Sequence, residues 1–345
     1  MYCEKRTKRT IGFIMIILVS FLVIGCTRSQ STNSEDDSKV NDESYETNDE
    51  QEETTSREIY LLSESGLVVP QVIDMPQAQS NEVALQTLHY LIKDGPVTEQ
   101  LPNGFEAVLP AGTEVLGLNL EEDGTLVIDL NEHFIEYDGD KEEQLLQALT
   151  YSLTQFDNVE RIKLWVNSQE LTEMPINQTS LVGGYSRDRG INLVQTDGID
   201  LLESESMTVY YPTDIHSQIV HVPVTKRVNM SEKSLDEALV ESLLEGPAYD
   251  IPLLHVFNPN VELLDVDFLT DGDIALTFND AILSDYEMNL IGDEVMETLV
   301  LSLTEQPHIS SVSIVVDGVD QVFNRHGVPY DQPVTRSALN DKNAS

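Results

Sequence analysis

Two stretches of the chain share one pattern of apolar and polar positions. In residues 123–134 an Asp-Gly turn precedes Leu126, Ile128 and Leu130, which alternate with other residues until Asn131. Residues 271–282 repeat the sequence of features: Asp-Gly, then Ile274, Leu276 and Phe278 in alternation, then Asn279. Alternation with period two predicts a half-buried strand, and glycine accepts the positive φ that a tight turn demands. Each stretch therefore predicts a turn, a strand and a strand exit.

The residues around these stretches predict the same order of elements twice, β-β-α-β-β-α-β. Ser80 is the expected N-cap of the first helix, Gly95 is expected in the left-handed conformation at its end, and Pro70 predicts an edge strand. The first set comprises strands 58–62 and 66–73, helix 81–93, strands 114–120 and 125–130, helix 141–156 and strand 161–167. The second set comprises strands 207–211 and 218–224, helix 234–244, strands 261–268 and 274–278, helix 293–303 and strand 311–317.

Matching helix ends support a duplication, because the first helix of each set stops at Gly-Pro, at 95–96 and at 246–247. We expect an α+β fold made of two tandem repeats of a small domain. The predicted organisation is a signal peptide (1–25), an acidic disordered tether (26–56), a first domain (57–180), an interdomain linker (181–205), a second domain (206–323) and a polar, frayed tail (324–345).

Charge and cysteine content restrict the functions that remain open. The chain of 345 residues has a formal net charge of −42, which disfavours nucleic acid and anionic lipid headgroups as partners. Its two cysteines, Cys3 and Cys26, lie at the N-terminus, so no disulfide and no thiol chemistry is expected in the folded region. Apolar burial alone must hold the domains together.

The N-terminus has the pattern of an export signal. Basic residues in positions 1–10 precede an apolar run, 11–24, that suits a signal-peptide core better than a membrane span. The run ends Leu22-Val23-Ile24-Gly25-Cys26, which resembles a bacterial lipoprotein box and predicts lipidation of Cys26 after cleavage. The mature chain would keep 15 basic and 60 acidic residues, a net charge of −45, behind a two-chain lipid anchor. An uncleaved N-terminal anchor is the alternative. Residues 27–56 contain almost no apolar side chain, which predicts a disordered tether.

Each repeat resembles the GerMN domain of sporulation and spore germination lipoproteins. The resemblance rests on the helix ends at 94–96 and 245–247, on 109–113, on the strand 126–131 with Phe134, and on Val-Val-Asp-Gly at 315–318. It implies a non-enzymatic lipoprotein on the extracytoplasmic face of the cell membrane, in the space between mother cell and forespore. There it would support a transenvelope complex with other sporulation envelope proteins, including ring-forming ones.

A search for chemical sites in the sequence predicts none: no catalytic, cofactor-binding or metal-binding residues. His216 and His221 have a poor spacing for one metal ion, and the acidic residues at 265–273 lack the EF-hand pattern. Ser186 does not lie in a nucleophile elbow, and Trp165 is expected to pack in the sheet. The alternative function is an extracytoplasmic module that binds cell-wall polymer (peptidoglycan) or a small ligand, and a wall-acting enzyme with a carboxylate pair is a third, weaker hypothesis.

Overall fold

The computed structural model describes residues 54–78, 82–95, 97–194, 204–230, 233–269 and 272–343. The chain forms two compact units, Met1–Glu50 and Gln51–Ser345, and all described residues belong to the second. The predicted signal peptide, Cys26, the N-cap residue Ser80 and the turn residue Asp271 lie outside the described residues.

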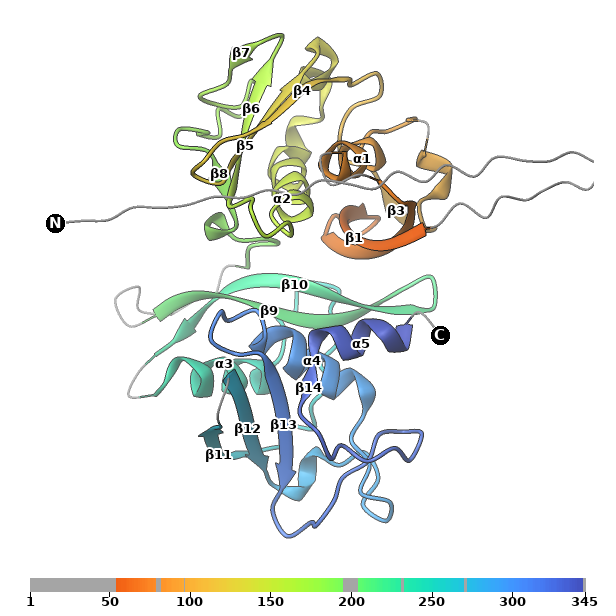
Figure 1. The fold of residues 1–345 in the computed structure, drawn as a ribbon. Coiled ribbons are helices and arrows are strands. Elements are labelled where there is room, and N and C mark those ends of the chain that lie inside the picture. The colour runs from red at the N-terminus through yellow and green to blue at the C-terminus, as the bar shows by residue number, and fades with distance from the viewer. Residues whose placement is uncertain are drawn as a thin grey trace, which may run out of the picture. The chain divides into compact units, whose positions relative to one another are not determined.

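The first copy contains a hairpin, two helices and a separate sheet (Figure 1). Short 3-10 turns at Thr98–Gln100, Glu132–Glu136, Gly139–Lys141 and Arg187–Arg189 connect the elements. The elements are β1 (Thr54–Ser63), β2 (Val68–Pro76), α1 (Val83–Tyr90), β3 (Phe105–Glu106), β4 (Val115–Leu120), β5 (Thr125–Leu130), α2 (Glu142–Leu153), β6 (Arg161–Val166), β7 (Gln169–Glu170) and β8 (Tyr185–Ser186).

The second copy repeats this order, with a further 3-10 turn at Asp280–Ile282. Its elements are β9 (Ser204–Ile215), β10 (Gln218–Asn229), α3 (Leu235–Glu245), β11 (Leu263–Phe268), β12 (Asp273–Phe278), α4 (Asp293–Leu303), β13 (Ser311–Val316), β14 (Val334–Thr335) and α5 (Arg336–Asn343). The chain is therefore an α+β protein with two tandem domains of the predicted β-β-α-β-β-α-β order, to which each copy adds short strands.

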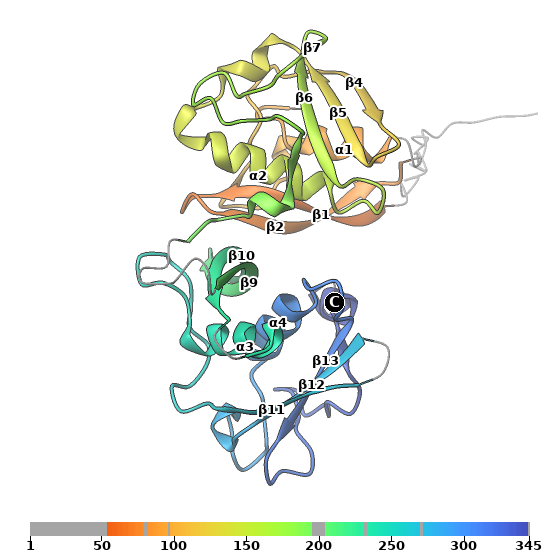
Figure 2. The ribbon, with the colours of Figure 1, turned by 90° about the vertical axis from the view of Figure 1, so that its left-hand side faces the viewer.

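The sheet of each copy combines an antiparallel hairpin with one parallel pair. In the first copy β4 pairs antiparallel with β5, and β5 pairs parallel with β6. In the second copy β11, β12 and β13 are arranged in the same way. A parallel pair requires a crossover, which α2 and α4 supply. Figure 2 shows α2 between this sheet and the β1–β2 hairpin, and in each domain the two helices contact each other, α1 with α2 and α3 with α4.

The cores follow the predicted apolar faces. Leu145, Leu146, Leu149 and Leu153 of α2, all expected to point inward, are at most 2% exposed. Strand β12 alternates between buried and half-buried positions as predicted, whereas β5 is buried at almost every position, including Val127.

One buried hydrogen bond occurs identically in both copies. The backbone N–H of Tyr60 in β1 donates to Ser152 Oγ in α2 at 2.8 Å. The backbone N–H of Tyr210 in β9 donates to Ser302 Oγ in α4 at 2.8 Å. Both serines are fully buried. Because a buried N–H needs a partner, the serine hydroxyl joins the first strand to the second helix in each domain.

The structure differs from the sequence expectations at both ends of the described chain. Strand β1 begins at Thr54, inside the expected tether, where Ser56 pairs with Asp74. The tail expected to be frayed instead forms β14 and α5. Leu339 of α5 is buried, and Arg336 donates to Leu301 O at 2.8 Å. The pairing of β14 with β13, the buried side chains of Val334 and Leu339 and the bonds of Arg336 thus hold a segment whose overall composition is polar.

Two further expectations are corrected by the backbone. Asp94, with φ 53°, takes the left-handed conformation after α1, and Gly95 does not, whereas Gly246 does have a positive φ after α3. The expected linker is ordered over its described part: Tyr185 pairs in the sheet through β8, and Ile191 is fully buried. These contacts make the segment part of the fold.

The segment after the first copy also contacts both copies. The Asn192 side chain accepts from Val68 N at 2.8 Å and donates to Pro223 O at 2.8 Å, which links β2 to β10. Arg187 donates to Thr154 Oγ1 at 2.8 Å and forms an ion pair with Glu305 at 3.3 Å. Glu305 also pairs with Arg336 at 2.8 Å. One carboxylate of the second copy therefore binds two arginines, one from each copy's C-terminal segment.

Candidate functional site

The residues singled out in the sequence do not converge in the structure. His216 Nε2 lies 3.5 Å from Glu64 Oε1, whereas His221 Nδ1 lies 3.3 Å from Glu297 Oε2, so the two histidines have different partners. Ser186 Oγ donates to Asp188, and Trp165 is half-buried in β6. Among the described residues, no three His, Cys, Asp or Glu side chains are placed to share a metal ion.

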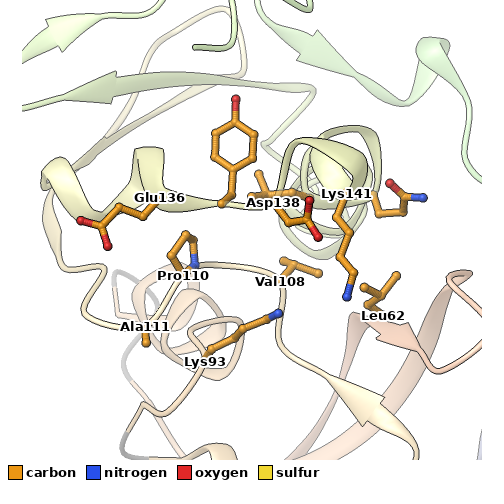
Figure 3. A pocket seen from close by; sticks show the side chains of 11 residues that line it. Leu62, Lys93, Val108, Pro110, Ala111, Glu136, Asp138 and Lys141 are labelled. Atoms are coloured by element: carbon orange, nitrogen blue, oxygen red, sulfur yellow. The ribbon is translucent and has the colours of Figure 1, made fainter. Parts of the chain in front are cut away.

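A cavity of about 310 Å³ in the first copy is a candidate site (Figure 3). It lies between the end of β1, the loop after α1, the turn after β5 and the start of α2. Its walls include the apolar side chains of Leu62, Val108, Pro110 and Leu145. Ligand pockets typically have this combination of apolar walls and a few polar groups.

Lys93 and Lys141 are the two cations among the side chains that line this cavity, beside the polar groups of Glu136, Asp138 and Gln144. Figure 3 shows the side chains of Lys93 and Lys141 extending toward each other. Lys93 Nζ lies 3.4 Å and Lys141 Nζ 3.7 Å from the same Glu106 oxygen. The lysines are about 40% exposed and Glu106 is 54% exposed, which makes these pairs weak. The arrangement can bind an anionic group only if that group displaces Glu106.

A buried carboxylate beside the cavity is fully used by the fold. Glu142, at the start of α2, accepts from Tyr137 Oη at 2.6 Å and from Asn177 N at 2.9 Å. Burial alone would raise the pKa of Glu142, but its hydrogen bonds from Thr179, Tyr137 and Asn177 outweigh burial and lower it. Glu142 therefore stays ionised as a fixed acceptor that holds the loop at 176–179, and it is not free to act as an acid or base.

The second copy has a cavity in the equivalent place with different chemistry. This cavity, of about 640 Å³, lies between the loop after α3, the turn after β12 and the start of α4. Apolar side chains such as Phe257, Ile282 and Val295 dominate its walls, and neither lysine has a counterpart there. The cavity thus comes with the fold of the domain, whereas the lysine pair belongs to the first copy alone.

The cluster of Lys93, Lys141 and Glu106 was not identified from the sequence. Its members come from the ends of α1 and β3 and from the turn before α2, and only the folded domain brings them together. The sequence holds one indication of these lysines: basic residues are rare, 19 in a chain with 61 acidic ones, so each of them could have been considered as a candidate.

Comparison with known proteins identifies the fold. The family described as "Germane: Sporulation and spore germination" matches residues 58–172 and 208–322, which covers both copies. The chain belongs to this family. It is 39% identical to the spore germination protein GerM of Bacillus subtilis over 291 residues, which is 84% of this chain and 78% of that protein. The solved structure of the tandem GerMN domains of GerM from Bacillus subtilis matches with a TM-score of 0.75 and 39% identity, covering 82% of this chain and 97% of that one.

Membership in the germane family places the protein in sporulation and spore germination, as the resemblance in the sequence implied. Both repeats are GerMN domains, in the tandem order of the solved relative. None of the helices in the described ranges combines the length and apolar character that spanning a bilayer requires.

Proposed function

We propose that the protein is a non-enzymatic, membrane-anchored lipoprotein whose two GerMN domains act as an assembly module in sporulation and germination. The module would support a complex that spans the space between the mother cell and forespore membranes. The observation that carries this proposal is the comparison of the two copies. The copies share their architecture and their buried anchoring contacts, but the polar groups of their cavities differ. This is the pattern expected if the function depends on the surface of the domain and not on a reactive pocket.

Further support comes from how the cavity's charged groups are used. Lys93 and Lys141 pair with Glu106, and Glu142 accepts hydrogen bonds that hold a loop. General acid–base catalysis needs a group that is free to exchange protons near a substrate. Because the bonds of Glu142 hold the loop at 176–179, this carboxylate is not free for that role, which supports a binding or assembly role.

The proposed anchor is a diacylated Cys26 followed by the acidic tether. In the experiment, the protein is isolated from membranes of the parent organism and its N-terminal peptide is analysed by mass spectrometry. We expect Cys26 as the first residue, carrying lipid. Cys26→Ala should abolish the lipid and yield either released protein or the longer precursor, and Cys3→Ala is the matched control. Membrane-bound Cys26→Ala protein of mature length would refute the anchor.

The role itself is tested by deleting the gene and measuring spore yield and germination separately. Reintroduced wild-type protein should restore both. Normal sporulation and germination of the deletion strain would overturn the proposal. A pull-down on purified peptidoglycan over a range of salt separates assembly from the alternative of binding cell-wall polymer, since retention on the polymer would favour the latter.

A further inference from the structure

Within the described residues, the sheet that contains the parallel pair ends in each domain on a long edge strand with no strand beside it. The four-strand path of the first sheet runs β4-β5-β6-β7, and the second sheet runs β11-β12-β13-β14. The far ends carry the two-residue strands β7 and β14, whereas β4 and β11 are six residues long. In Figure 2, β4 lies at the outer margin of its sheet. We refer to β4 and β11 as the open edges. Such an edge offers unpaired backbone groups to another strand.

The hydrogen-bond register determines which backbone groups along the open edges point away from the sheet. Glu121 N donates to Thr125 O at 2.9 Å, and Leu269 N donates to Asp273 O at 2.8 Å. Backbone groups of an antiparallel strand point alternately toward and away from the neighbouring strand. The N–H and C=O groups of Leu118 and Leu120 therefore point away from β5, and those of Val266 and Phe268 point away from β12.

The open edges also carry large apolar side chains at equivalent positions. Leu116 and Leu264 are 50% and 48% exposed, and Leu120 and Phe268 are 45% and 55% exposed. The register shift of each ladder falls at the same place, between Val115 and Gly117 in β4 and between Leu263 and Asp265 in β11. In a chain of net charge −42, solubility alone does not explain why both copies expose apolar residues on the strand that is free to pair.

The residues flanking the open edges are acidic. Glu114, Glu121 and Glu122 flank β4, and Glu262, Asp265 and Asp267 lie in or beside β11, all of them exposed. In β11, the outward N–H of Val266 donates to the Asp265 carboxylate at 3.0 Å. An incoming strand would replace this bond with a backbone carbonyl and would release the carboxylate to pair with a cation.

We propose that the open edges bind, by strand addition, an extended segment of a partner protein in which apolar residues alternate with lysine or arginine. Strand addition obtains affinity from backbone hydrogen bonds and specificity from alternate side chains. The apolar residues of the partner would cover Leu116 and Leu120, or Leu264 and Phe268, and its basic residues would face the acidic flank. This inference rests on the proposed assembly role and names the surface and the partner chemistry for it.

A second copy of the same chain is a poor occupant of this surface. Two open edges brought together would place acidic flanks opposite each other, and like charges across paired strands are destabilising. Each chain carries a net charge of −42, so self-association is also opposed at long range. A basic partner removes both penalties.

The probe for this inference is a synthetic peptide of alternating lysine and valine, as long as β4, titrated into the full-length protein in detergent. One control peptide has the same composition with lysines and valines in separate blocks, and another alternates glutamate with valine. We expect the Lys-Val peptide alone to bind saturably and its affinity to fall as salt rises. If the block peptide bound equally well, the net charge of the peptide alone would explain binding, and the inference would be overturned.

Variants locate the bound peptide. Leu120→Gln combined with Phe268→Gln should weaken Lys-Val binding about fivefold, because each site loses part of one apolar contact. The matched control is Val182→Gln combined with Tyr249→Gln, which alters exposed apolar residues away from the open edges and should leave affinity unchanged. All four residues are exposed, and circular dichroism is the check that both variants fold. Unchanged affinity in the Leu120/Phe268 variant would overturn the inference.

The same variants separate this inference from the proposed function in cells. A sporulation defect in the Leu120→Gln, Phe268→Gln strain, with normal membrane attachment, would support the open edges as the docking surface. A defect in the deletion strain, together with normal sporulation of this variant, would refute the surface and leave the assembly role standing. Sedimentation in which this variant abolishes a homodimer would instead assign the edges to self-association and overturn the partner chemistry.

Discussion

The paired serine bonds allow the same perturbation to be made once in each domain. Ser302→Ala removes the acceptor of the Tyr210 N–H, and Ser152→Ala removes the acceptor of the Tyr60 N–H, both at 2.8 Å in the wild type. Since the serines are fully buried, water cannot replace the lost oxygen without opening the core. The backbone N–H is left without a partner in each case.

The magnitude follows from two opposing terms. An orphaned buried donor costs about 1–3 kcal/mol, whereas alanine is a better helix former than serine by roughly 0.5 kcal/mol. Each substitution should therefore lower the free energy of unfolding by about 1–2 kcal/mol. For a single domain of this size that corresponds to a fall of roughly 4–10 °C in Tm, and to about half that value if both copies unfold as one unit.

Differential scanning calorimetry measures this directly, and the absence of cysteine from residues 27–345 removes disulfide exchange as a complication. Ser310→Ala, at an exposed serine beside β13, is the matched control and should change Tm very little. Two transitions, only one of which moves in each variant, would show that the copies unfold independently. Equal stability of Ser302→Ala and Ser310→Ala would refute the argument that the N–H of Tyr210 depends on this hydroxyl.

Three further predictions concern charge. Burial lowers the pKa of His221 to about 4 in the folded protein. As the pH drops below about 6.5, the unfolded chain therefore binds a proton that the folded protein does not, and the free energy of unfolding falls. Urea unfolding should show that this free energy decreases by about 2 kcal/mol between pH 7 and 5, and the decrease should be absent in His221→Gln. Glu305→Gln removes the carboxylate shared by Arg187 and Arg336 and should cost about 2 kcal/mol. A double-mutant cycle with Arg187→Met should then show coupling above about 0.5 kcal/mol, and additivity would mean that the pair contributes nothing. Association of the protein with itself should strengthen as salt screens its net charge of −42. Sedimentation that shows the same degree of association at all salt concentrations would contradict this prediction.

Local periodicity was sufficient to predict the element order, because a core-facing stripe and a turn dipeptide are both encoded within a few residues. The inward leucines of α2 and the alternation of β12 are examples. The end of α1 was predicted less well: Asp94 adopts the left-handed conformation that glycine usually takes, since asparagine and aspartate tolerate it.

Features that depend on distant contacts could not be predicted in this way. The helix α5 is fixed by the bonds of Arg336 to Leu301 and Glu305, which lie more than thirty residues earlier. The cluster of Lys93, Lys141 and Glu106 likewise needs three separate segments to meet. Neither pattern leaves a periodic trace in the sequence.

The two copies within one chain help to separate what the fold requires from what function adds. Both keep the serine that anchors the first strand, which packing demands, and their cavities differ in charge, so the two cavities are not built for the same ligand. Packing within the domain accounts for only part of the apolar surface of the open edges, since about half of each side chain faces solvent. A folded monomer would be more soluble with polar residues at Leu116, Leu120, Leu264 and Phe268. Their presence at matching positions is therefore best explained by a contact that the monomer alone does not make.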